Sequence, residues 1–148
     1  DNTSLEQAIP PEAREQAYGQ KSLTKQSIRR GLFSSLVKDD NIGKLVPMTY
    51  FSNKEGNISI DDLLGFRFAV ISSKDPKDLL NKESLNSFKK INAVFIDISK
   101  YSFLDPEFEE LVGIGGMIVR PDKVIYGTVS NGVTLQNLAD ELFNSLIK

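Results

Sequence analysis

The sequence predicts an α/β domain in which a mixed β-sheet is flanked by helices, so that the fold has three layers. Two observations predict it. Two short apolar runs with β-branched and aromatic residues are separated by a helical segment, which is the pattern of two parallel strands joined by a crossover. A hairpin pattern and an amphipathic helix follow them. The chain has 148 residues, 40% hydrophobic and 26% charged, a composition typical of globular domains.

Two regions are expected along the chain. Residues 1–42 would form a helical connector or the tail of a preceding domain, and residues 43–148 the α/β domain. The chain begins with Asp1 rather than Met, and its first residues are polar, so we interpret it as a segment of a longer protein. A trimmed tag or a processed N-terminus would give the same start.

The connector is expected to contain one or two helical pieces. Ser22 or Thr24 could cap a helix that runs toward Leu36. The basic side chains along it would suit an anion-binding or partner-binding patch, but a solvated helical face is favoured because their spacing follows no known pattern. These side chains are Lys21, Lys25, Arg29 and Arg30.

A β-hairpin is expected after Gly43. The runs GKLVPMTYF and ISI flank the turn-forming SNKEGN, and Pro47 restricts the first run to the edge of a sheet. The following DDLLG closes a short turn. Its adjacent Asp61 and Asp62 could bind a cation, but a metal site needs several converging oxygens, so a turn or a helix cap is favoured.

The central strands are expected at Phe66–Ile71 and Ala93–Ile98, both of the type that is buried on two faces. Asp97, at the end of the second strand, occupies a position where α/β folds often place functional residues. A catalytic role for Asp97 is not favoured, because no His, Lys or second acid is obviously beside it.

A helix is expected between these two strands. Pro76 suits its first turn, Ser73 or Asp75 suits its cap, and it would run to about Lys90. Its core side would be formed by Leu80, Leu85 and Phe88.

After the second strand, a short helix should start near Pro106 and end at the glycines that follow residue 112. The clearest hairpin signal comes next. Met117–Val119 and Val124–Tyr126 flank Arg120-Pro121-Asp122-Lys123, whose proline and aspartate are typical of a type I turn.

The last helix is the best defined in the sequence. Thr134 would cap it, and Val133 and Leu138 would form a hydrophobic staple. Its apolar residues fall on one face, for which packing against the core is favoured over a partner-binding stripe. They are Leu135, Leu138, Ala139, Leu142 and Leu146.

From Gly65 onward this order of elements is that of the thioredoxin-like fold. In thioredoxin-like enzymes a reactive dithiol follows the first central strand, where a helix N-terminus lowers the thiol pKa. Here that position reads Ser72-Ser73-Lys74-Asp75-Pro76, and serine cannot cycle through a disulfide. Residues 112–116, before the hairpin, also lack the proline that this fold usually holds there in the cis form. We therefore expect the scaffold without its redox site.

Other chemistry is also absent from the sequence. With no Cys and no His, the chain cannot form disulfides, thiol nucleophiles, Cys/His zinc sites or a Ser-His-Asp triad. The motif Gly113-Ile114-Gly115-Gly116 lacks the GxGxxG spacing and precedes a strand, so dinucleotide binding is not expected. We therefore assign no catalytic, cofactor-binding or metal-binding residue within this chain.

Charge and hydropathy limit the expected partners. The 18 basic and 20 acidic residues give a net charge of −2, which does not suggest nucleic acid. No run approaches the ~18 apolar residues of a membrane span, and the start does not look like a secretory signal. The absence of cysteine fits a reducing cytoplasm, which is the expected location.

Four local patterns stand in a notable order: Gly43-Lys44-Leu45-Val46-Pro47, then Asp61–Val70, then Val119-Arg120-Pro121-Asp122, then the leucine-rich last helix. Together they resemble the C-terminal region of flavin-dependent aromatic-ring monooxygenases, of the 3-(3-hydroxyphenyl)propionate hydroxylase and phenol hydroxylase group. The resemblance covers roughly residues 43–148. Met48 departs from the pattern, since the family often has Gln after the proline of the first motif.

The resemblance implies a parent protein that uses FAD and NAD(P)H to insert one oxygen atom of dioxygen into a phenolic ring. It places the FAD and substrate sites in N-terminal domains outside this chain, which would be the partners of this domain. It also implies that the C-terminal domain lacks the dithiol and takes part in subunit contacts, hence a homo-oligomer. No catalytic residue of the family corresponds to a position here.

One alternative stays open from the residues alone. The chain could be a stand-alone thioredoxin-like binding protein for a small aromatic ligand or a protein partner, because nine Phe and four Tyr could line a pocket as well as a core. A thiol oxidoreductase or peroxidase is excluded by the absence of cysteine.

Overall fold

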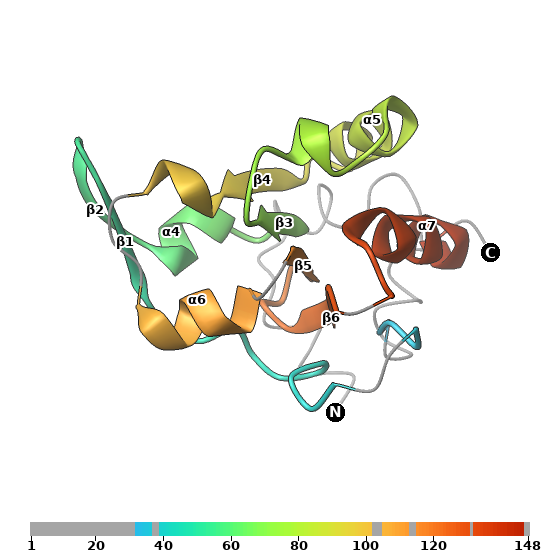
Figure 1. The fold of residues 1–148 in the computed structure, drawn as a ribbon, viewed down its shortest axis with the longest axis horizontal. Coiled ribbons are helices and arrows are strands. Elements are labelled where there is room, and N and C mark those ends of the chain that lie inside the picture. The colour runs from blue at the N-terminus through green and yellow to red at the C-terminus, as the bar shows by residue number, and fades with distance from the viewer. Residues whose placement is uncertain (1–31, 37–38, 102–104, 113–114, 131, 147–148) are drawn as a thin grey trace.

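The computed structural model describes residues 32–36, 39–101, 105–112, 115–130 and 132–146, and the helices expected within residues 1–31 lie outside this part. Helices and strands are interspersed along it (Figure 1). The elements are β1 (Tyr50–Asn53), β2 (Gly56–Ser59), α4 (Ile60–Leu64), β3 (Ala69–Ser72), the 3-10 helix η1 (Pro76–Asp78), α5 (Lys82–Lys90), β4 (Val94–Asp97), the 3-10 helix η2 (Ile98–Lys100), α6 (Pro106–Val112), β5 (Gly116–Val119), β6 (Ile125–Thr128) and α7 (Leu135–Leu146).

Four strands form the central sheet in the order β4-β3-β5-β6. β3 and β4 are parallel, with Ala69 opposite Val94 and Ser72 opposite Asp97. β5 runs antiparallel to β3 on one side and to β6 on the other. The two apolar runs of the sequence are therefore neighbouring parallel strands, which confirms the expected mixed sheet and its thioredoxin-like order.

Helices cover both faces of this sheet, as Figure 1 shows for α5 and α7 on one side and α4 and α6 on the other. The residues of each strand alternate between these faces, as the pleat requires. On the α5 and α7 side the core consists of Leu32, Phe68, Val70, Leu80, Phe88, Ile118, Tyr126, Leu135, Leu138, Ala139, Leu142 and Leu146. On the α4 and α6 side it consists of Val46, Phe51, Ile60, Leu64, Ala69, Ile71, Ile96, Ile98, Phe108, Val112, Met117, Val119 and Ile125.

An aromatic pair contributes to the core on each side of the sheet. Phe88 on α5 contacts Phe143 on α7 with ring centroids 4.7 Å apart, and Phe51 on β1 contacts Phe108 on α6 at 5.1 Å. Phe51, Phe88 and Phe108 are completely buried, and burial of such a side chain stabilises the fold by about 1.5–3 kcal/mol. The expected core faces of the last helix and of the strands are confirmed.

The hairpin expected after Gly43 is shorter than the sequence suggested. β1 and β2 form a separate two-stranded sheet that starts only at Tyr50. Residues 43–46 instead run along the outer edge of β6, where Gly43 N donates to Ile125 O (2.9 Å) and Val46 N donates to Lys123 O (2.8 Å). This segment covers a sheet edge that would otherwise present unpaired backbone groups.

The prediction of a single helix from Pro76 to Lys90 is wrong. The chain forms η1, leaves the helical path, and starts again as α5. Asp75 caps η1 by accepting from Lys77 N (3.0 Å), and Asn81 caps α5 by accepting from Ser84 N (2.8 Å). The backbone N–H of Asn81 donates to the side chain of Gln136 on α7 (2.8 Å), so a tertiary contact fixes the break.

The turn between β5 and β6 has the expected chemistry. Lys123 N donates to Arg120 O (2.9 Å), which is the hydrogen bond of a type I turn. Lys123 then takes a left-handed conformation (φ 69°), as the bulge residue after a type I turn does, while a separate shift of register between β5 and β6 lies between Ile118 and Val119. A type I turn followed by such a bulge is a common hairpin geometry.

The cap of α7 is also as expected. Thr134 Oγ1 accepts from Asn137 N (3.1 Å), while Asn137 Oδ1 accepts from Thr134 N (3.0 Å). This is a reciprocal capping box in which asparagine replaces the usual Glu or Gln.

Candidate functional site

The end of β3 and the loop that follows it occupy the position of a thioredoxin-like dithiol. Ser72 is completely buried, and its hydroxyl donates to Lys74 O (2.6 Å). Ser73 N donates to Gly115 O (3.2 Å), which ties the loop to the start of β5. Both serines are therefore engaged with the backbone, and they hold the shape of the loop rather than present a nucleophile.

The segment before β5 differs from a redox site as well. All peptide bonds of the described residues are trans, and residues 113 and 114 of the glycine motif lie outside that part. Gly115 and Gly116 lead into a strand, and a Cβ on Gly115 would lie 2.6 Å from Val129. These glycines make close packing possible and do not form the helix N-terminus that would receive a dinucleotide pyrophosphate.

A pocket of about 290 Å³ lies at the carboxyl ends of β3 and β4. It is bounded by the residues that follow β3, by one side of α5, and by the residues that follow β4. Its lining comprises Asp75, Pro76, Lys77, Leu85, Lys89, Phe95, Ile96, Asp97, Lys100 and Tyr101. Asp97, singled out from the sequence, is part of this lining.

Asp97 is buried and serves as a cap. Its Oδ1 accepts from Ser99 N (3.0 Å) and from the Ser99 hydroxyl (2.6 Å), which starts η2. Nearby, burial raises the pKa of the Tyr101 phenol, so it stays protonated at neutral pH. Asp97 thus has a structural role in shaping the pocket wall.

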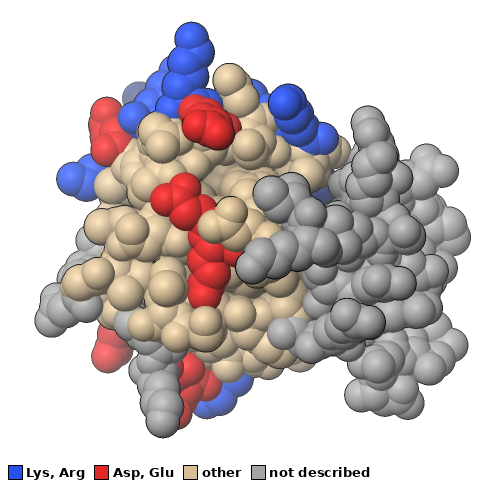
Figure 2. Space-filling model, turned by 90° about the vertical axis from the view of Figure 1, so that its right-hand side faces the viewer, with Lys and Arg blue, Asp and Glu red and all other residues tan. Residues whose placement is uncertain are grey.

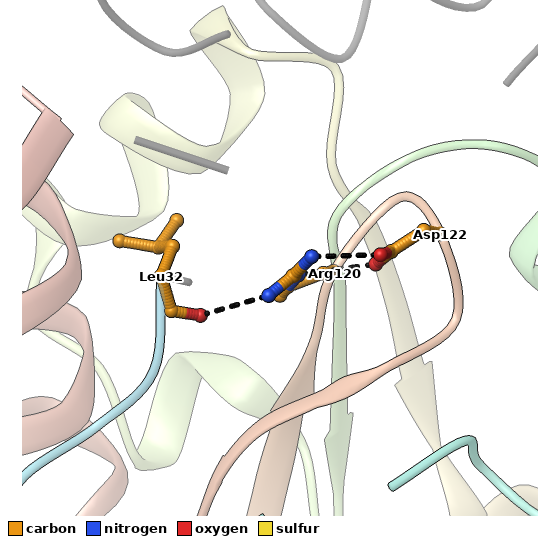
Figure 3. Close-up of polar contacts among 3 residues, drawn as sticks. All are labelled: Leu32, Arg120 and Asp122. Carbon is orange, nitrogen blue, oxygen red and sulfur yellow. Dashed lines mark hydrogen bonds and ion pairs between the residues drawn. The ribbon is translucent and has the colours of Figure 1, made fainter. Parts of the chain in front are cut away.

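A buried ion pair lies in the turn between β5 and β6, and its arginine also contacts residues 32–36, here called the N-terminal segment (Figure 3). Arg120 Nε and Nη2 donate to the two carboxylate oxygens of Asp122 at 3.1 and 2.7 Å. Arg120 Nη1 also donates to Leu32 O (3.4 Å), and the guanidinium lies 4.8 Å from the centre of the Phe33 ring. The two side chains are only 2% and 3% exposed, so the pair is screened very little by water.

A second polar cluster joins the same segment to α7. Tyr126 hydroxyl donates to Glu141 Oε1 (3.0 Å), and both the backbone N–H and the hydroxyl of Ser35 donate to Glu141 Oε2 (2.9 and 3.0 Å). Burial raises the pKa of the Tyr126 phenol, and the adjacent carboxylate raises it further. Burial alone would also raise the pKa of Glu141, but hydrogen bonds from Ser34, Ser35 and Tyr126 outweigh it and lower the pKa.

Glu141 is expected to make stability depend on pH. Because its folded pKa lies below the ordinary 4.5, its contribution is complete above that pH and is lost as the pH falls through the folded pKa. Glu141→Gln should cost about 1 kcal/mol at neutral pH and flatten the fall of the melting temperature in acid.

Circular dichroism melting curves between about pH 3 and 7 would measure this effect. Glu110→Gln, an exposed change on α6, is the matched control. If wild type and Glu141→Gln lost melting temperature equally with acid, the assignment to Glu141 would be contradicted.

The other residues singled out from the sequence have structural roles where they are described. Asp61 and Asp62 lie in the first turn of α4, in agreement with the favoured interpretation, and Ser59 Oγ caps this helix by accepting from Asp62 N (3.2 Å). Asp61 pairs with Lys123 (Nζ to Oδ1, 2.8 Å). Within the described residues no cluster of three or more potential metal ligands occurs. The basic residues Lys21, Lys25, Arg29 and Arg30 lie outside that part.

Charge is mixed on the face at the α7 end. Figure 2 shows a line of acidic side chains across this face, with Lys and Arg side chains gathered at its upper edge. A hollow of about 530 Å³ between α5 and α7 is also acidic, with Glu83 and Asp140 in its lining. Among the described residues, none of the helices has the length and apolarity needed to span a bilayer.

Sequence reasoning missed three features of the site. The lysines of the pocket come from separate elements, so no local motif marked them. The Tyr126–Glu141 contact joins a strand to a helix, and only the periodicity that buries Tyr126 hinted at a need for a partner. Arg120 and Asp122 were recognised as turn residues, but their burial depends on the N-terminal segment that covers them.

Comparisons with known proteins give a match of fold only. No protein-family model matches the chain, and no curated protein sequence does. Among solved structures, OxyS anhydrotetracycline hydroxylase from Streptomyces rimosus is similar over 80% of this chain, with a TM-score of 0.53 and 16% sequence identity. The match covers 24% of that protein, so this chain spans about a quarter of its length. At this identity the likeness shows a shared fold.

Proposed function

We propose that the chain is a non-catalytic thioredoxin-like domain of an FAD-dependent aromatic-ring monooxygenase of the 3-(3-hydroxyphenyl)propionate hydroxylase type. Its role there is packing against the FAD and substrate domains and subunit contact in a homo-oligomer, in the cytoplasm. The observation that carries the proposal is the likeness of fold to a segment of a hydroxylase that is more than three times as long as this chain. The sequence patterns at residues 43–47, 61–70 and 119–122 support it independently.

The site chemistry supports a non-catalytic role. The hydroxyls of Ser72 and Ser73, at the dithiol position, donate to backbone carbonyls. Gly115 and Gly116 lead into the strand β5. The described residues therefore do not fit a bound dinucleotide, and the FAD and NAD(P)H of the proposed parent would be held by other domains.

The chain by itself is expected to bind no flavin and to oxidise no NADH. Purified protein should show no absorbance near 450 nm after incubation with FAD and gel filtration, because the glycine segment before β5 leads into a strand and offers no helix N-terminus to a pyrophosphate. Flavin retained at one equivalent per chain would refute the non-catalytic assignment.

The genomic reading frame upstream of Asp1 provides the second test. A frame that continues for several hundred residues and contains GxGxxG is the result expected for a hydroxylase. A start codon just before Asp1 would instead favour a stand-alone binding protein, for which the pocket beside β3 and β4 is the specific support.

A further inference from the structure

The pocket at the ends of β3 and β4 lies at a switch point of the sheet. The chain leaves β3 toward η1 and α5, whose Phe88 packs with α7. It leaves β4 toward η2 and α6, whose Phe108 packs on the opposite face (Figure 1). In open α/β sheets, a crevice between adjacent parallel strands whose connections diverge in this way is where ligands bind.

The lining of this pocket has more basic than acidic side chains. Lys77 comes from η1, Lys89 from the last turn of α5, and Lys100 from η2, so three separate elements each contribute a lysine to the lining, here called the lysine rim. The ion pairs of the described residues involve Arg120 and Lys123, and none involves these three lysines. The two acids of the lining, Asp75 and Asp97, already accept capping hydrogen bonds.

Apolar side chains also contribute to the lining of the pocket. Leu85, Phe95 and Tyr101 are half-buried and line it beside the buried Ile96. A volume of about 290 Å³ is small among ligand pockets and suits a single ring or a short branched chain. The neutral Tyr101 phenol adds no negative charge to the site.

We propose that this pocket binds a small organic monoanion whose apolar body lies against Phe95 and Tyr101 and whose carboxylate faces the lysine rim. The ligand class is a carboxylic acid with one ring or a comparable hydrocarbon body. This site goes beyond the proposed function, because a domain without catalysis would still carry a ligand-responsive site.

Benzoate, benzamide and acetate are the probes, and the measurement is a ¹H–¹⁵N NMR titration of the 148-residue chain at constant ionic strength. Benzoate should bind with an affinity in the millimolar range, as its size allows, and should shift the amides of Asp75, Lys77 and residues 95–101. Benzamide, which lacks the charge, and acetate, which lacks the ring, should each bind at least about fivefold more weakly.

Two charge-matched double variants test the lysine rim. Lys77→Gln with Lys100→Gln should weaken benzoate binding about five- to tenfold, whereas Lys44→Gln with Lys82→Gln, both outside the pocket lining, should not. The site is refuted if benzoate gives no saturable shifts at these amides, if acetate or benzamide binds as well as benzoate, or if both double variants lose affinity equally. Each readout concerns this chain alone, so failure here leaves the monooxygenase proposal standing.

Discussion

Asp122→Ala is expected to lower the free energy of unfolding by about 3–5 kcal/mol, one of the two largest effects in this protein. Removal of the carboxylate leaves the Arg120 guanidinium in a site where its side chain is 2% exposed, and among the described residues its remaining partners are Leu32 O and the Phe33 ring. An uncompensated buried charge costs far more than the pair itself contributes. Since a domain of this kind has a total stability of about 5–15 kcal/mol, the loss would be visible in urea unfolding at pH 7.

The double variant Arg120→Met with Asp122→Ala separates the charge from the contact. Because it removes the stranded cation and fills the space with an apolar side chain, it should be more stable than Asp122→Ala alone. A surface pair would behave differently, with a loss of less than about 1 kcal/mol in the single variant and no recovery in the double. That pattern would show that the pair is accessible to water.

Gly116→Ala should be comparably destabilising, by about 2–6 kcal/mol, because backbone strain and overpacking of about 1–3 kcal/mol each would add. Gly116 has φ 143° at the start of β5, a conformation that alanine rarely adopts. A Cβ there would overlap the carbonyl oxygen of Ile71 and lie 3.1 Å from Ser72 Cα. These are backbone atoms of the neighbouring strand, so they can yield only by disrupting the pairing of β5 with β3.

Gly56→Ala is the matched control for this change. Gly56 has φ 118° in the β1–β2 hairpin, but nothing lies within 4 Å of the position of a Cβ. It should therefore cost the strain alone, about 1–3 kcal/mol. Equal losses for the two variants in urea unfolding would mean that the contact between β5 and β3 is looser than described.

The sequence was sufficient wherever the signal was local. The turn at residues 120–123, the cap at Thr134 and the apolar face of α7 all follow from interactions between residues a few positions apart. The parallel pairing of β3 and β4 was also predictable, because two buried-type strands joined by a helix have few ways to share a sheet. The absence of thiol chemistry was evident from composition alone, because the sequence contains no cysteine.

The expected site residues were only partly informative. Asp97 was placed correctly at a strand end, yet its role is that of a cap. Ser72 and Ser73 were recognised as substitutes for a dithiol, but only the structure shows that their hydroxyls close the loop. The pocket lysines had no sequence signal, because the rim is assembled from three elements that are not adjacent in the chain.

Tertiary structure decided the features that depend on distant partners. The break before α5 is fixed by Gln136, 55 positions from Asn81, and the burial of Arg120 depends on Leu32, 88 positions away. The path of residues 43–46 was set by the open edge of β6. The intrinsic helix propensities of ordinary residues differ by less than about 1 kcal/mol per residue. Leaving a buried charge or backbone group without a hydrogen-bond partner destabilises the fold by more than that. Partners far along the chain therefore determine these features.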